Sequence, residues 1–386
     1  MFQHHIEVAY LFLMVASGLI VAGILFLLFL KYRQNYYAKE KQRLSLKYQE
    51  YMSYVLAHLD AQQPLELPVG ELGKLELLVL GEKLMEIAER VKGKHRLQLA
   101  ALFEKLGLPE IELNRLKQAP GPLRSHAAYK LGAMGYEKAT PELFAALKAE
   151  KDEAGRYIIA RAIARCTRNV ADLRQMIQQM IEQSADSPRL LAEVLADSPL
   201  DLQPLLREWI NSEDTRLVLI ALACLPTTLD ERMMDSLWKG LDSNEKEVRI
   251  QSAKLLLGCE GLHSEQIHAL LTNPDWEIRA LVVKALGSWK DESSVPTLLA
   301  AINDQHWWVK YHAARSLVRV GDEGFRALCE LASRTTHQET VDLAMQQIQE
   351  ALREDKLTSK KSVARTDNRL TIYDAYFNRQ GERVIS

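Results

Sequence analysis

The longest uninterrupted apolar stretch lies close to the start of the chain. Residues 8–30 contain no charged side chain, and residues 1–30 as a whole carry only Glu7. As a helix with a rise of about 1.5 Å per residue, residues 8–30 would extend about 34 Å, enough to cross a hydrocarbon core of about 30 Å. The stretch is apolar on every face, which is rare in globular helices. The sequence therefore predicts one transmembrane helix here.

Further along the chain, apolar positions follow a helical period and the pattern recurs. Positions 278, 282, 285, 286 and 289 fall on one helical face, and a similar unit follows with an offset of 31 residues. Pro296 suits the first turn of a second helix, where its missing N–H costs nothing. Each unit is predicted to be two antiparallel helices. Because one pair cannot bury its apolar face alone, we expect an all-α solenoid of about seven to eight stacked pairs over residues 120–355.

The repeated unit has a recognisable consensus. Asp275 to Gly287 fits most of the pattern D-x-x-x-V-R-x-x-A-A-x-A-L-G, and Asp304 to Leu317 fits it apart from Lys310 in place of arginine and a slightly longer start. This pattern resembles the short bacterial HEAT-like repeats that are also found in phycobilin lyase subunits. The resemblance implies the solenoid architecture and says little about function, because solenoids serve many roles.

One basic residue marks each unit and forms a ladder along the chain. Successive members are 32, 33, 27, 33, 30 and 31 residues apart. The members are Arg124, Arg156, Arg189, Arg216, Arg249, Arg279 and Lys310. In HEAT-like repeats the equivalent arginine pairs with a nearby acidic residue and braces neighbouring units, and Asp152 and Asp275 stand four residues before Arg156 and Arg279. We interpret the ladder as mainly structural, with a ligand-binding groove as the alternative.

The remaining segments have other patterns. Residues 31–63 read as a basic juxtamembrane helix, and residues 64–119 read as a helical N-terminal cap without the repeat signature. Residues 356–386 read as a flexible basic tail, because their first half is polar and charged. Within that tail, the more apolar residues 369–377 could be a short recognition segment or a docked strand.

Charge is unevenly distributed and predicts an orientation. Residues 31–50 carry +4, residues 351–386 carry +3 and residues 1–30 carry −1, so the total of −2 leaves −8 for residues 51–350. The positive flank places the solenoid in the cytoplasm and the N-terminus outside, in an inner or plasma membrane. Four cysteines without a CxxC pair agree with a reducing compartment. A solenoid of −8 argues against nucleic-acid binding.

Candidate chemistry is sparse. The sequence has no GxSxG, Walker or HExxH motif, and it lacks the His-Glu dipeptides of the di-iron HEAT-repeat hydroxylases. We therefore expect no catalytic residue, no metal site and no cofactor. Gly18 and Ala22 form a small-xxx-small pair in the apolar stretch, which could let two copies of the helix pack as a homodimer.

Aromatic residues gather near the end of the solenoid. Trp276 and Trp307 occupy equivalent positions in successive units, so they either pack between repeats or belong to a partner-binding patch. The candidate patch comprises Trp276, Trp307, Trp308, Tyr311, His312 and Arg315.

Together these features predict a membrane-anchored scaffold that binds a protein partner, and no enzyme. The whole chain resembles a group of bacterial membrane-anchored HEAT-repeat proteins that share the N-terminal span, the non-repetitive cap and a WWV[RK] repeat near the end. Members are often encoded beside membrane glycosyltransferases, which implies an accessory subunit for polysaccharide synthesis or export. A phycobilin-lyase-like small-molecule binder and a nucleic-acid-binding HEAT-like protein are the alternatives.

Overall fold

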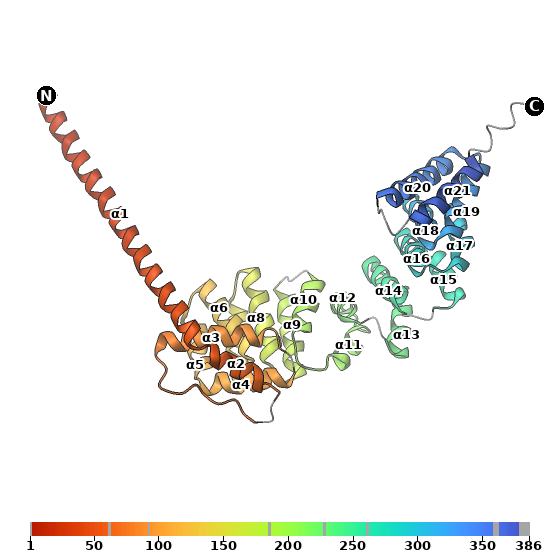
Figure 1. Cartoon of the computed structure of the whole chain (residues 1–386). Coiled ribbons are helices and arrows are strands. Elements are labelled where there is room, and N and C mark those ends of the chain that lie inside the picture. The colour runs from red at the N-terminus through yellow and green to blue at the C-terminus, as the bar shows by residue number, and fades with distance from the viewer. Residues whose placement is uncertain are drawn as a thin grey trace, which may run out of the picture. The chain divides into compact units, whose positions relative to one another are not determined.

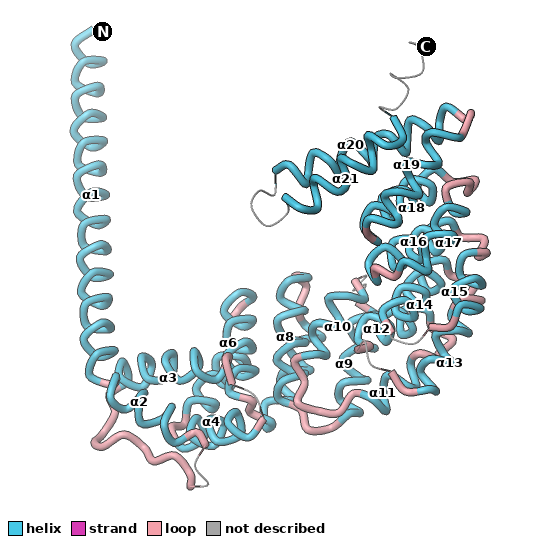
Figure 2. Tube along the Cα trace, turned by 45° about the vertical axis from the view of Figure 1, so that its right-hand side comes forward, coloured by secondary structure: helices cyan, strands magenta, loops and turns pink. Residues whose placement is uncertain are grey.

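The computed structural model describes residues 2–60, 63–91, 93–183, 187–226, 229–259, 262–357 and 363–377. Across these residues the regular elements are helices, and no strand occurs among them (Figures 1 and 2). The chain divides into two compact units, Met1–Leu202 and Gln203–Ser386. The predicted all-α solenoid, with about seven to eight helix pairs, is confirmed.

The first unit begins with a helix of 46 residues, α1 (Phe2–Lys47). Its part Ser17–Lys47 is long and apolar enough to cross a membrane, judged by length and composition. The predicted juxtamembrane helix thus continues the apolar helix without interruption. The helix ends at Lys47, and Tyr48 separates it from α2 (Gln49–His58). Because the basic segment has no helix breaker, nothing in it ends the helix that the apolar segment begins.

The cap follows and joins α1 through charge pairs. It consists of α3 (Lys74–Ala88), α4 (Lys94–Lys105) and α5 (Leu108–Gln118). Lys41 and Lys47 of α1 pair with Glu82 and Glu76 of α3 at 2.5 Å and 2.6 Å. Beneath these pairs lies a core that includes the fully buried Phe103. The region predicted as a cap is therefore helical, and its helix α3 packs against the C-terminal part of α1, while its role as a cap stays a prediction.

Helix pairs complete the first unit. They are α6 (Gly121–Met134) with α7 (Thr140–Ala149), and α8 (Glu153–Cys166) with α9 (Val170–Glu182), followed by α10 (Pro188–Ala196); the short 3-10 turn Glu137–Ala139 precedes α7. Asp152 caps α8 by accepting from the backbone N–H of Gly155 at 2.8 Å. Cys166 is a buried free thiol, and burial raises its pKa to about 12.

The second unit continues the alternation. Its first helices are α11 (Gln203–Trp209), α12 (Thr215–Cys224), α13 (Glu231–Gly240), α14 (Lys246–Gly258) and α15 (Ser264–Leu271). They are followed by α16 (Trp276–Trp289), the 3-10 turn Glu292–Ser294, α17 (Val295–Ala301), α18 (Trp307–Val320), α19 (Asp322–Arg334), α20 (Gln338–Leu357) and α21 (Val363–Phe377). Helices α12, α14, α16, α18 and α20 lie side by side in that order, and α13, α15, α17 and α19 pack against them.

The C-terminal tail departs from prediction. The expectation of a flexible segment is wrong for residues 363–377, which form α21, and the alternative of a docked strand is wrong as well. Arg369 is 2% exposed; it pairs with Asp355 at 3.0 Å, donates to the carbonyl of Val318 at 2.8 Å and lies over the ring of Phe325. These contacts hold α21 against α19 and α20. Residues 378–386 of the tail lie outside the described residues.

Candidate functional site

The first two turns of α18 carry an aromatic surface, defined here as Trp307, Trp308, Tyr311 and His312. A spacing of four residues places Trp307 beside Tyr311 and Trp308 beside His312. The ring centroids of the first pair are 5.2 Å apart with planes at 20°, and those of the second are 5.9 Å apart at 26°. The two indoles meet edge to face at 4.8 Å. The four rings therefore form one continuous cluster.

The cluster faces outward on a helix that is firmly held. Trp307 and Trp308 are 44% and 45% exposed. Val309, Ala313 and Leu317, on the opposite face of α18, are fully buried in the core of the second unit. The tryptophans are thus presented on a rigid element, with a large apolar area in contact with water.

Trp276 does not belong to this surface. Its indole stacks on the ring of His306, with centroids 4.0 Å apart and planes at 7°, and it is partly buried against the core. It therefore braces α16 against the turn that precedes α18. The two tryptophans at equivalent repeat positions have different surroundings, and Trp307 is the exposed one.

Positive charge surrounds one end of the aromatic surface. Burial of the His312 ring lowers its pKa below the ordinary 6.5, and the charges of Lys284, Arg315 and Arg319 lower it further. His312 is consequently neutral at pH 7. Arg315, predicted as a member of the patch, is partly buried and contributes charge beside the rings.

The basic ladder is most regular in the second unit. The guanidinium of Arg249 donates two hydrogen bonds to the carboxylate of Asp275, at 2.6 Å and 3.1 Å. Arg279 donates to Asp304 in the same way, at 2.7 Å and 2.8 Å. Each arginine also donates to a carbonyl in the turn before its own helix, at 2.8 Å and 2.9 Å. Each therefore ties the start of its own helix to the start of the corresponding helix in the next repeat.

The partner within the ladder differs from the one that sequence spacing indicated. The ion pair of Arg279 is with Asp304 of the following repeat, while Asp275 serves Arg249 of the preceding one. At Arg156 the expected acid, Asp152, is used as a helix cap, and the guanidinium donates to the carbonyl of Lys151. The reason is geometric, since Asp275 and Asp304 lie just before the start of a helix, where their carboxylates face the arginine of the preceding repeat.

The other ladder members are less uniform. Lys310 continues the inter-repeat pattern with Glu339 at 3.1 Å, and Arg124 pairs with Glu150 at 2.9 Å. The two residues around the 27-residue spacing pair with acidic residues that are close to them in the sequence. These are Asp214 for Arg216, and Glu193 for Arg189, whose side chain is 89% exposed. The predicted role as a structural ladder remains a proposal for these two positions.

Lowering the pH should weaken the two Arg–Asp ion pairs between repeats. The hydrogen bonds from Arg249 lower the pKa of Asp275. Burial raises the pKa of Asp304, but the hydrogen bonds from Arg279 and from the backbone N–H of His306, together with nearby positive charge, outweigh it, and the net pKa is lowered. A carboxyl with a lowered folded pKa stabilises the fold above its unfolded pKa of about 3.9, and this contribution is lost as pH falls through the folded value. We expect Asp304→Asn to cost about 1–3 kcal/mol at neutral pH.

The measurement is thermal or urea unfolding of wild type and variant between about pH 6 and pH 3. The stability gap should narrow as pH falls below about 4, because wild type then loses the same interaction. Asp242→Asn, at an exposed turn, is the matched control and should show no gap. A gap that stays constant down to about pH 3 would contradict the assigned role of Asp304.

Two further predictions concern other parts of the chain. Gly18 and Ala22 are both exposed on α1, and a Cβ at Gly18 would have no neighbour within 4 Å, so a second helix has room to approach there. The homodimer stays a prediction.

Among the residues with described side chains, no group of three or more His, Cys, Asp or Glu could hold a metal ion.

The family comparison applies to the region that carries the aromatic surface. Residues 264–352 match the family model of HEAT repeats. This region of the chain is therefore similar to HEAT repeats. The match runs from α15 into α20 and includes the braces of Arg279 and Lys310. None of the curated proteins compared with the chain matches it.

The solved structures that are similar to the chain have low sequence identity to it. An engineered protein is 15% identical, with a TM-score of 0.31, over 84% of this chain and 98% of its own. A chain from the structure of Kap95p with RanGDP is 14% identical, with a TM-score of 0.38, over 81% of this chain and 48% of its own. Human deoxyhypusine hydroxylase in complex with glycerol is 15% identical, with a TM-score of 0.25, over 78% and 97%.

Proposed function

We propose that this protein is a membrane-anchored scaffold that binds a protein partner through the aromatic surface of its last HEAT repeats. The observation that carries the proposal is the pair Trp307 and Trp308, each nearly half exposed on a helix whose other face is buried. Tryptophan and tyrosine are enriched at binding hot spots, because they bury a large area with little loss of rotamer freedom. A partner that covered them would remove this apolar area from water.

The surroundings of the aromatic surface favour a partner with apolar and acidic side chains. Lys284, Arg315 and Arg319 are near enough to His312 to lower its pKa, so they provide positive potential beside the rings. Opposite charge at the rim of an interface mainly speeds association and selects the partner. Chemical crosslinking in native membranes, followed by purification of the full chain and of its Trp308→Ala variant, tests the scaffold role.

Anchoring through α1 is the second part of the proposal. The helix is long and apolar enough, and the +4 of residues 31–50 favours a cytoplasmic location for everything after it. We expect a cysteine at the exposed position Glu350 to resist an impermeant thiol reagent in intact cells and to react after lysis. A cysteine at Gln3 should react in intact cells. Labelling of the 350 site before lysis would refute this orientation.

The finer assignment concerns the pathway. We propose an accessory role beside a membrane glycosyltransferase, in polysaccharide synthesis or export, and its support is the resemblance of the whole chain to the membrane-anchored HEAT-repeat group. The same crosslinked sample tests it. Recovery of a glycosyltransferase with the full chain, and its loss with the Trp308 variant, is the expected result. Recovery of other proteins without a glycosyltransferase would support the scaffold role and would reject the proposed pathway.

A further inference from the structure

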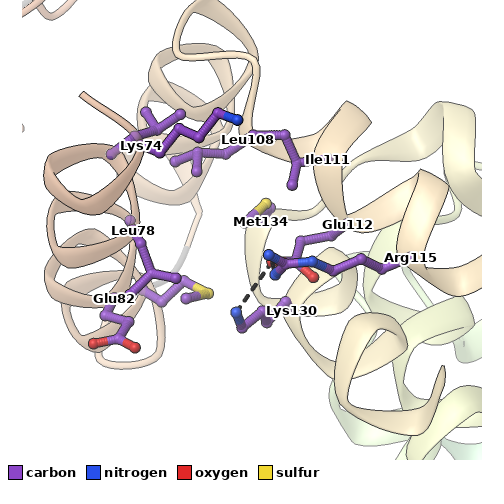
Figure 3. Close-up of a pocket in the computed structure, with 12 residues that line it drawn as sticks. Lys74, Leu78, Glu82, Leu108, Ile111, Glu112, Arg115, Lys130 and Met134 are labelled. Carbon is purple, nitrogen blue, oxygen red and sulfur yellow. Dashed lines mark hydrogen bonds and ion pairs between the residues drawn. The ribbon is translucent and has the colours of Figure 1, made fainter. Parts of the chain in front are cut away.

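The N-terminal cap contains a pocket between α3, α5 and α6 that the repeat architecture does not explain (Figure 3). Its volume is about 300 Å³, at the lower end of the range for small-molecule sites. The walls are mainly aliphatic, formed by Leu77, Leu78, Met85, Leu108, Ile111 and Met134. A site of this kind suits a hydrocarbon group.

Buried charge lies in one wall of the pocket. Glu112 and Lys130 are 4% and 8% exposed, and Lys130 Nζ donates to Glu112 Oε1 at 3.0 Å. Arg115 Nη1 donates to the same oxygen at 2.8 Å, while Glu112 Oε2 accepts no hydrogen bond from the described residues. A buried ion pair is weak evidence for stability, because desolvation can exceed the Coulombic gain. Because Glu112, Arg115 and Lys130 line the pocket, their polar atoms can contact the polar end of a ligand.

The pocket has an excess of positive charge. One carboxylate, Glu112, faces the two cations Lys130 and Arg115, and the other acid in the lining, Glu82, is paired with Lys41 of α1 at 2.5 Å. Lys74 extends over the opposite end of the pocket, near Leu108 (Figure 3). A ligand with an anionic head is therefore favoured over a cationic one.

The position of the pocket indicates where such a ligand would come from. Glu82 of the pocket wall is tied to Lys41, which lies 11 residues beyond residue 30, the end of the apolar stretch. That separation is about 16 Å along a helix. If α1 is a membrane anchor, as the proposed function holds, the pocket wall is fixed close to the membrane surface.

We propose that this pocket binds the aliphatic chain of an anionic amphiphile. The aliphatic chain of the ligand lies between the aliphatic walls of the pocket, and the anionic head of the ligand accepts hydrogen bonds from Lys130 and Arg115. A free long-chain fatty acid and an anionic phospholipid share this chemistry. The inference rests on the proposed membrane anchoring for the supply of ligand, and on the pocket alone for the binding.

Photo-labelling of the full chain in phosphatidylcholine nanodiscs tests this assignment. One arm contains a long-chain fatty acid with a terminal diazirine, a second contains phosphatidylglycerol with the same acyl chain, and a third contains the matching fatty alcohol. Peptide mass spectrometry locates the adducts. We expect adducts on α3, α5 or α6 from at least one anionic probe, with the alcohol labelling about tenfold less. The anionic arm that labels identifies the source.

Two filling variants and a matched control complete the test. Leu78 and Ile111 are 36% and 38% exposed at the pocket, so Leu78→Trp and Ile111→Trp can occupy space there without disturbing the buried core. Each should reduce pocket labelling about tenfold. Leu97→Trp, at an exposed position of α4 outside the lining, should leave it unchanged.

The outcomes separate this inference from membrane anchoring. Absence of pocket adducts, equal labelling in the filling variants, or equal labelling by the alcohol would each overturn the proposal. Adducts within residues 8–30 report anchoring independently. Adducts there without any in the pocket would reject the ligand and keep the anchor. Fatty-acid adducts in the pocket, with none in residues 8–30 from any probe, would keep the site and reject the anchor.

Discussion

Replacing Trp308 with alanine should weaken partner capture at least about thirtyfold, while the melting temperature changes little. A truncated hot-spot tryptophan costs at least about 2 kcal/mol of binding free energy, which corresponds to that factor. Trp308 is 45% exposed, so the folded chain loses mainly its ring contacts with Trp307, Tyr311 and His312. Truncation of an exposed side chain typically changes stability by under about 0.5 kcal/mol, so the melting temperature should change little.

The chain contains its own comparison for this experiment. Trp209 is 2% exposed in α11, and Trp209→Ala should cost about 3–5 kcal/mol of unfolding free energy through cavity formation. Trp276→Ala removes the stack on His306 and should destabilise without a specific loss of capture. Capture of the crosslinked partner and thermal unfolding are measured on all three variants. Unchanged capture by a folded Trp308→Ala, or a Trp209-like loss of stability, would remove Trp308 from the interface.

The repeat architecture could be predicted from sequence because it depends on local pattern. Helical periodicity, the 31-residue offset and the position of Pro296 were sufficient for the solenoid. Exposure within the repeat was not predictable. Trp276 and Trp307 share a register, but Trp276 stacks on His306 in the turn of the next repeat, whereas Trp307 stacks on Tyr311 of its own helix. A repeat consensus therefore predicts the fold, but the exposure of each surface side chain depends on the neighbours of that particular side chain.

Contacts between distant residues account for the differences. The tail was expected to be flexible because its residues are polar, but Arg369 pairs with Asp355, 14 residues earlier in the chain, and donates to the Val318 carbonyl, 51 residues earlier. The cap pocket is similar, since Glu112 and Lys130 are 18 residues apart on different helices. Neither pairing follows a spacing that a sequence pattern records. Such buried charges become interpretable only when their surroundings are known.

The glycine of the repeat consensus, by contrast, can be explained by one close contact, as Gly287 shows. It stands eight residues after Arg279, and Gly132 stands eight residues after Arg124. A Cβ at Gly287 would lie 2.5 Å from the Ser316 side chain and 2.8 Å from the backbone α-carbon of the same residue. Helices α16 and α18 therefore approach so closely that only glycine fits. The equivalent Cβ at Gly132 would lie 2.8 Å from the backbone α-carbon of Ala162.

We accordingly expect Gly287→Val to destabilise the second unit by about 3 kcal/mol. The valine must push α18 away, since the nearest atoms include backbone, and overpacking of a close contact costs about 1–3 kcal/mol or more. Helix propensity would favour valine slightly over glycine, so the loss must come from packing. Urea unfolding of the full chain, followed by a probe in the second unit, measures the change.

Gly258→Val is the matched control for this variant. Gly258 ends α14 much as Gly287 lies near the end of α16, but a Cβ there has no neighbour within 4 Å, so stability should change little. Ser316→Gly in the Gly287→Val background removes the side chain at 2.5 Å and leaves the backbone of α18 as the remaining obstacle. It should restore part of the lost stability, which appears as a coupling free energy in the double-mutant cycle. Equal losses at both glycines, or strict additivity with Ser316→Gly, would show that helix approach does not constrain Gly287.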